Sequence, residues 1–159
     1  MPVASRPTGR RIAPEVRVSA VARAPIAQAG IARLAAAVVA AERAPVDALS
    51  ITLVGPAHMR SLNRTHLGHD RVTDVIAFAF TSGPGRRSRL VGDVYICPTV
   101  AVAQARDFGT TPKEELRRLV VHGVLHVTGH DHPAGEARLT SPMWRRQERY
   151  LARFGSLAR

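Results

Sequence analysis

Apolar and polar residues follow two different periods along the first two thirds of the chain. Alternation with a period of two, and short apolar runs between turn-forming residues, are typical of strands. Helical spacing and alanine-rich stretches indicate helices, and polar stretches with glycine indicate loops. Strands are expected at residues 16–19, 47–54, 75–80 and 92–97. Helices are expected at 24–43, 57–63 and 99–107, and loops at 67–71 and 83–89.

The pattern from residue 111 onward predicts a central helix with a clear start. Thr111 is a natural N-cap, Pro112 suits the first helical position, and Glu114 completes a capping box. Gly129 is the expected end of this helix. Apolar residues surround nearly the whole helix, which predicts that it is buried. They are Leu116, Leu119, Val120, Val124, Leu125 and Val127, together with Gly123.

A last helix is expected to carry two contrasting faces. Apolar residues from Met143 to Phe154 share one face, whereas Arg145 and Arg149 lie on the other. The arginine face is either a contact for RNA or the ribosome, or a solvated surface, and both interpretations stay open. Strands and helices are interspersed without a strict repeat, so we expect an α+β fold with a single mixed sheet, helices and a central buried helix.

Length and composition predict one domain over residues 15–159, preceded by a basic flexible tail at 1–14. No apolar run is long enough to cross a bilayer and no signal core is visible, so we expect a cytoplasmic protein without a membrane partner. Cys97 is the only cysteine, which excludes an internal disulfide and a thiolate zinc cage. A metal ion would need nitrogen or oxygen ligands.

The formal net charge of +11 favours an anionic partner such as RNA. Lys113 is the only lysine, so 22 of the 23 basic residues are arginines. Arginine suits phosphate oxygens, but a GC-rich coding sequence also produces arginine in place of lysine. The choice of arginine therefore has two equal explanations, while the net positive charge still favours RNA.

Three histidines have the spacing of a catalytic metal site. His122 and His126 are four residues apart on the predicted helix, so their side chains share one face. Gly129 reverses the chain and His132 follows three residues later, which leaves a tetrahedral ion one open position. We therefore predict one divalent ion per chain, Zn²⁺ by preference, held by these three histidines. His130 is an alternative third ligand, which the spacing favours less.

The residue after the first histidine distinguishes the site from that of many metalloproteases. Those enzymes place a general-base glutamate there, whereas this chain has Gly123. A peptidase would then lack the group that takes a proton from the attacking water. The sequence therefore disfavours peptide hydrolysis.

Residues 122–132, with the sequence HGVLHVTGHDH, resemble the H-G-x-L-H-L-x-G-Y-D-H signature of the YbeY-type endoribonucleases. Residues 73–78 and 92–96 are similar to two further family motifs, T-D-V-L-S-F and G-D-I-x-I. The resemblance extends over about residues 47–154. It implies a metal-dependent, single-strand-directed endoribonuclease in ribosomal RNA processing, maturation and ribosome quality control, acting through metal-activated water. It also implies the small ribosomal subunit or its proteins as partners.

The resemblance leaves one catalytic group to be assigned. Many family members carry an arginine, thought to act on the RNA phosphate, where this chain has Leu67. Arg71 is our candidate for that role, and Arg64, Arg71, Arg145 and Arg149 are candidates for RNA binding. Two alternatives to a nuclease stay open: a ribosome-associated assembly factor with a mainly structural metal, and a metalloprotease-like hydrolase.

Overall fold

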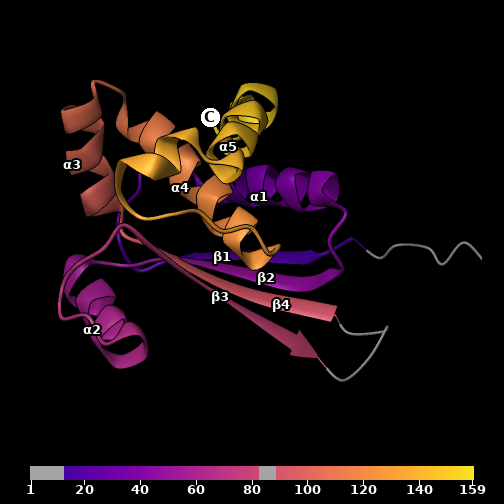
Figure 1. Ribbon diagram of the computed structural model, residues 1–159, viewed down its shortest axis with the longest axis horizontal. Helices are drawn as coiled ribbons and strands as arrows, with labels where there is room; N and C mark the ends of the chain where they lie inside the picture. Colours follow the sequence, from indigo (N-terminus) through magenta and orange to yellow (C-terminus); the bar gives the residue numbers. More distant parts are fainter. Residues whose placement is uncertain (1–12, 83–88) are drawn as a thin grey trace, which may run out of the picture.

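The structure is a computed structural model that describes residues 13–82 and 89–159. The described residues form four strands, five α-helices and two short 3-10 helices (Figure 1). The strands are β1 (Glu15–Ala20), β2 (Val46–Leu53), β3 (Val75–Ser82) and β4 (Arg89–Ile96). The α-helices are α1 (Gln28–Glu42), α2 (Pro56–Leu67), α3 (Pro98–Phe108), α4 (Pro112–Val127) and α5 (Pro142–Phe154). The 3-10 helices are η1 (Gly135–Thr140) and η2 (Gly155–Leu157).

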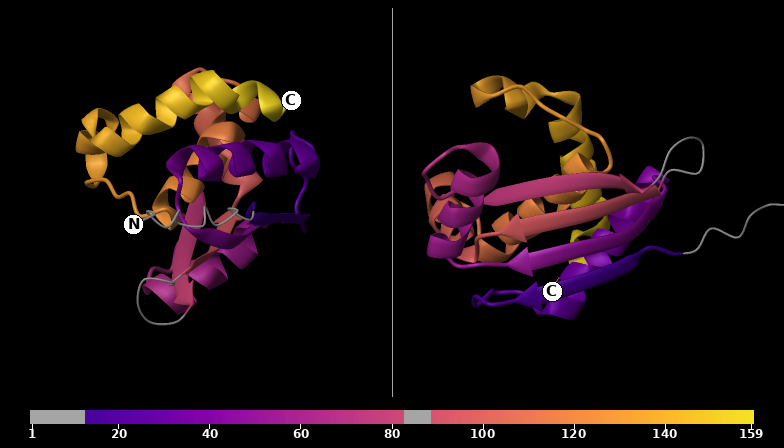
Figure 2. Two further views of the ribbon diagram at one scale, coloured as in Figure 1. Left: turned by 90° about the vertical axis from the view of Figure 1, so that its right-hand side faces the viewer. Right: turned by 90° about the horizontal axis from the view of Figure 1, so that it is seen from below.

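The four strands form one mixed sheet in the order β1-β2-β4-β3. Strands β1, β2 and β4 are parallel, and β3 pairs antiparallel with β4 from Val75↔Ile96 to Ser82↔Arg89. Figure 1 shows α1, α3, α4 and α5 on one side of the sheet and α2 on the other. The right-hand view of Figure 2, from below, shows the strands in front of α1 and α4. The predicted α+β class with a single mixed sheet is confirmed.

Three predicted boundaries were wrong, each for a local reason. Helix α1 begins only at Gln28, because Ala27 is still in extended backbone. Helix α2 continues through Leu67 and ends at Gly68, whose positive φ of 72° stops it, so the loop predicted at 67–71 starts later. Arg89, predicted in a loop, is the first residue of β4 and pairs with Ser82 of β3. The rest of that loop, 83–88, and residues 1–12 of the predicted tail lie outside the described residues.

Helix α4 is the buried centre of the helical layer, as predicted. The hydroxyl of Thr111 accepts a hydrogen bond from the backbone N–H of Glu114, and the Glu114 carboxylate accepts one from the backbone N–H of Thr111. This completes the predicted capping box. The helix contacts α1, α3, α5, β3 and β4, and its buried side chains belong to the main core. Its carboxyl end is thereby fixed against the sheet.

Gly123 allows α4 to lie close to the middle of the sheet. A Cβ atom at this position would lie 2.5 Å from Cγ1 of Val94 on β4, closer than packed side chains approach. Residue 123 follows the first predicted metal ligand, at the position where a metalloprotease would carry its glutamate. The packing therefore leaves no room there for a glutamate side chain.

We expect Gly123→Ala to lower the free energy of unfolding by about 1–2 kcal/mol. Overpacking costs about 1–3 kcal/mol, and the better helix propensity of alanine offsets at most about 1 kcal/mol of it. Urea unfolding of both proteins measures the difference. In a Val94→Ala background the clash is relieved, so the same substitution should become neutral or stabilising. An equal loss in both backgrounds would contradict this packing argument.

A second, smaller cluster lies on the opposite face of the sheet, beneath α2. Met59 of α2 packs there with Val54, Ile76 and the single cysteine, Cys97, all buried. Cys97 is thus on the other side of the sheet from α4. Within the described ranges, no helix combines the length and the apolar character that crossing a membrane requires.

Candidate metal centre

Three imidazole side chains converge near the carboxyl end of α4. His122 and His126 lie one turn apart, and their Nε2 atoms are 3.1 Å from each other. The chain then turns at Gly129, whose φ of 100° favours glycine, and returns His132. The Nε2 atom of His132 lies 3.2 Å from that of His122. The three histidines are therefore positioned to bind one metal ion, as their spacing predicts.

The second nitrogen of each ring fixes how the ring points. All three Nδ1 atoms lie 2.8–3.0 Å from an oxygen that can only accept, so each Nδ1–H donates and each Nε2 carries a free lone pair. The acceptors are Oε1 of Gln147 for His122, and the backbone carbonyls of His130 and Pro133 for His126 and His132. Three lone pairs therefore face one point, where a cation relieves their mutual repulsion.

The donor set fits a zinc-like ion. Nitrogens about 2.1 Å from a tetrahedral ion lie about 3.4 Å apart, close to the two Nε2 separations. Burial lowers the pKa of His122 to about 4, and burial together with the neighbouring His132 lowers the pKa of His126. Both rings are neutral at neutral pH, which is the form that binds metal. Three ligands leave a fourth position of a tetrahedral ion for water or substrate.

Gln147 is the site residue that the sequence interpretation missed. It comes from α5, is fully buried, and accepts the hydrogen bond from His122. Its position among the apolar residues of that helix was the available signal, because a polar side chain on a buried face needs a specific partner. Asp131 differs from Gln147 because it bonds backbone and not an imidazole ring: it accepts a hydrogen bond from the backbone N–H of His132 and so stabilises the turn.

Glu42, at the end of α1, connects the loop that follows Gly129 to α5 through hydrogen bonds. Its side chain is 5% exposed and accepts hydrogen bonds from His130, Arg146 and Tyr150. The Nε2 atom of His130 is thereby held by Glu42, and the group of histidines positioned to bind a metal ion contains His132 in its place. The backbone carbonyl of His130 instead orients His126. Glu42 therefore acts on the site through the loop that carries His130.

We expect Glu42→Gln to lower the free energy of unfolding by about 1–3 kcal/mol at neutral pH, because three partly buried partners lose a charged acceptor. Burial raises the Glu42 pKa, but the bonds from Tyr150, His130 and Arg146 outweigh it and hold the pKa below 4.5. The stabilisation is thus present above the unfolded carboxyl pKa and lost as pH falls below it. Urea unfolding near pH 7 and pH 3 should show the difference shrink in acid. Glu136→Gln, an exposed control, should differ little at either pH.

The histidines open into a cleft between α4, the start of β3 and the loop that follows Gly129. Among the described residues that line it are Leu67, Asp74 and Arg138. Arg138 of η1 is the one arginine in that lining, and its guanidinium forms no hydrogen bond or ion pair with residues 13–82 or 89–159. Leu67 is half-exposed in the wall. The positively charged side chain in this lining thus comes from η1, a segment in which the sequence showed no motif.

The four predicted arginines lie outside the lining of this cleft. Arg64, on α2, and Arg71, in the following loop, are exposed. Arg145 and Arg149 are exposed on α5, where Arg145 donates to the carbonyl of Thr140. Their roles in RNA binding, and that of Arg71 in catalysis, stay predictions.

Comparisons with known proteins agree with the geometry. A Sulfurihydrogenibium protein named Endoribonuclease YbeY is 43% identical over 88 residues, which cover 55% of this chain and 58% of that protein. A protein of the same name from Solibacter usitatus is 40% identical over 115 residues, covering 72% and 69%. The aligned segment thus spans less than two thirds of the Sulfurihydrogenibium protein.

The fold is also similar to a solved structure. The solution structure of a Thermotoga maritima protein superposes with a TM-score of 0.58 at 25% identity, covering 89% of this chain and 92% of that one. A family model described as Endoribonuclease YbeY matches residues 18–155, which include the three histidines. The chain therefore belongs to the YbeY family.

Proposed function

We propose that this chain is a metal-dependent endoribonuclease that cleaves single-stranded RNA. The observation that carries the proposal is the convergence of three Nε2 lone pairs in an open cleft, which is also lined by Arg138, an arginine without a partner among the described residues. The names of the family relatives support RNA as the substrate. The net charge of +11 is that of a protein with a polyanionic partner.

The residues in and behind the cleft have different roles in the proposed hydrolysis of a phosphodiester. A divalent ion held by the three histidines would activate water and stabilise negative charge on a phosphoryl oxygen. Gln147 and the loop carbonyls keep the imidazoles in the tautomer that binds metal. Arg138 is placed to neutralise the phosphate through its planar fork of donors. A carboxylate at position 123, which peptide hydrolysis would need, has no space beside Val94.

The wider setting is part of the same proposal. We take zinc as the preferred ion because three neutral imidazoles suit it, with other divalent ions as competitors. Ribosomal RNA is the proposed natural substrate, in maturation and quality control, with the small ribosomal subunit as partner and the cytoplasm as location. Arg64, Arg71, Arg145 and Arg149 are proposed to hold RNA outside the cleft, within a single domain over 15–159.

Cleavage of one labelled RNA, single-stranded or annealed to its complement, tests the activity. We expect the single strand to be cut faster, cutting to stop after chelation, and activity to return with Zn²⁺. Metal analysis of the purified protein identifies the ion that it carries. Cleavage that survives complete metal removal would overturn the proposal. Binding to small ribosomal subunits without any cleavage under all divalent ions would favour the assembly-factor alternative instead.

A further inference from the structure

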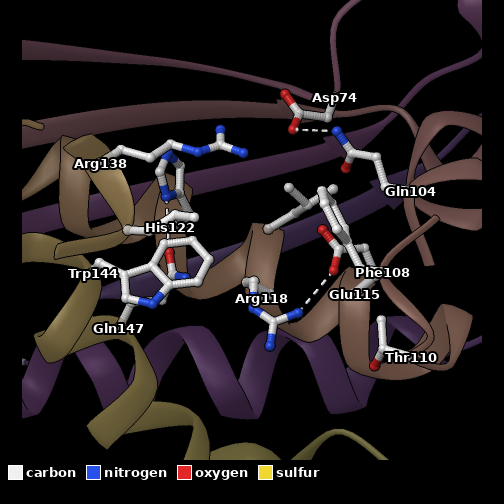
Figure 3. Close-up of a pocket in the computed structure, with 12 residues that line it drawn as sticks. Asp74, Gln104, Phe108, Thr110, Glu115, Arg118, His122, Arg138, Trp144 and Gln147 are labelled. Carbon is white, nitrogen blue, oxygen red and sulfur yellow. Dashed lines mark hydrogen bonds and ion pairs between the residues drawn. The ribbon is translucent and has the colours of Figure 1, made fainter. Parts of the chain in front are cut away.

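A separate hollow of about 290 Å³ lies beside the cleft, between α4, α3 and α5. Figure 3 shows Arg138 and Trp144 on one side of it and Gln104 and Phe108 on the other. Asp74, His122 and Arg138 line both the hollow and the cleft. A molecule bound at the histidines can therefore extend directly into this hollow.

Gln104, in the wall of the hollow, carries a buried hydrogen-bond acceptor that finds no partner among the described residues. The Nε2 atom of Gln104 donates to Oδ2 of Asp74 at 3.0 Å, and because a carboxylate only accepts, this bond fixes the orientation of the amide. The Oε1 atom of Gln104 is buried and accepts no hydrogen bond from the described residues. Such an acceptor costs free energy unless a water molecule or a ligand donates to it.

The remaining lining combines further acceptors with flat apolar surfaces. Glu115 is 4% exposed and accepts from Arg118, which leaves its carboxylate with spare acceptor capacity. The guanidinium of Arg118 lies 5.8 Å from the centre of the Trp144 ring. Phe108, which is 64% exposed, also lines the hollow. Aromatic rings and guanidinium planes are the surfaces on which proteins stack unpaired bases.

We infer that this hollow binds the base of a nucleotide next to the phosphodiester in the cleft and prefers bases with an exocyclic amino group. The inference rests on the proposed function, because the nucleotide belongs to the same RNA. Arg138, on the shared rim, is where the phosphate between hollow and cleft would lie. The hollow thus selects which RNA sequence is cut.

The preference follows from the acceptors. Adenine, cytosine and guanine each carry an amino group that can donate to Gln104 Oε1. Uracil carries carbonyl oxygens at its edge and only a single N–H donor. Its oxygens would face Gln104 Oε1 and the Glu115 carboxylate, which are also acceptors, and Gln104 Oε1 would receive no hydrogen bond from an amino group. Uracil is therefore the base that the hollow disfavours.

The single tryptophan of the chain provides a local probe. In ¹⁵N-labelled full-length protein, the one indole N–H signal belongs to Trp144, and titration with nucleoside 5′-monophosphates reports on the hollow. We expect AMP, CMP and GMP to shift this signal and UMP to bind about tenfold more weakly, as the loss of one buried hydrogen bond implies. Inorganic phosphate alone should leave the signal in place.

Variants separate base recognition from binding of the shared phosphate. Gln104→Leu should remove the preference, weakening AMP, CMP and GMP about tenfold while UMP is unchanged. Phe108→Ala, at an exposed position, should weaken all four nucleotides equally, and Gln28→Leu, the same substitution at the exposed start of α1, should change none. An indole signal that no nucleotide moves, or UMP binding as tight as that of the others, would overturn the inference.

This test does not depend on the nuclease proposal, because monophosphates contain no phosphodiester to cleave. Base-dependent binding without any RNA cleavage would leave the base site standing and refute the nuclease proposal. RNA cleavage without base-dependent binding would do the opposite. When both hold, cleavage of RNAs that differ only in one nucleotide should be slowest with uracil at the position that enters the hollow.

Discussion

His126→Ala should abolish both metal binding and RNA cleavage. The substitution removes one of only three ligands that the described residues bring within 4.8 Å of one another. Loss of a residue that merely orients a ligand lowers metal affinity about 10–100-fold, so loss of the ligand itself should lower it by more than about a hundredfold. Metal content after dialysis and cleavage of single-stranded RNA measure the two effects. We expect the same result for His122→Ala and His132→Ala.

Graded and neutral substitutions make this result specific. Gln147→Leu keeps all three ligands but removes the acceptor of the His122 Nδ1–H, so it should weaken metal binding about 10–100-fold. His58→Ala removes an exposed histidine of α2 and should change neither metal content nor cleavage. Circular dichroism checks that each variant is folded. Full metal content in all three ligand variants would contradict the site, and unchanged cleavage in them would indicate a contaminating nuclease.

The ligand histidines could be predicted because their geometry is local. A four-residue step on a helix and a return after a glycine bring His122, His126 and His132 together whatever the rest of the fold does. The capping box at Thr111 is local in the same way. The antiparallel pairing of β3 in a sheet that is otherwise parallel depends instead on how distant segments meet, and only its mixed character could be anticipated.

The residues that complete the site come from distant segments, which explains why no motif revealed them. Gln147 lies 25 residues after His122 in the chain, and Glu42 lies 88 residues before His130. Both act through contacts that exist only once α1 and α5 have packed beside α4. Gly123 was interpreted by its lack of a carboxylate, whereas the structure gives it a packing reason as well. Packing against Val94 thus restricts position 123 to a residue without a side chain, whatever reaction the site catalyses.

The cation proposed to act in catalysis also comes from a distant segment, as the position of Leu67 shows. It lies in the wall of the cleft, where many family members are expected to carry an arginine, and the nearby arginines in sequence lie outside that lining. The guanidinium that lines the cleft comes from η1, 71 residues later in the chain. A charge can be supplied from either segment, because the phosphate responds to the position of the cation and not to its place in the sequence.

Arg138→Ala should lower kcat/KM for RNA cleavage by about 10²–10³, the usual loss when one donor to a developing negative charge is removed. Metal content should stay unchanged, because the guanidinium makes no hydrogen bond with the described residues, the three histidines included. Stability should change little for the same reason. Arg138→Lys keeps the charge but not the planar fork, so its activity should fall between the two.

Arg71→Ala is the decisive comparison, since Arg71 was the candidate from sequence. If Arg138 acts on the phosphate in the cleft, Arg71→Ala and Arg145→Ala should weaken RNA binding modestly and make it less dependent on salt, with kcat retained. Steady-state cleavage at two salt concentrations separates these effects. A larger loss of kcat in Arg71→Ala than in Arg138→Ala would assign the cation to the loop after α2. It would also imply that this loop moves towards the histidines when RNA binds.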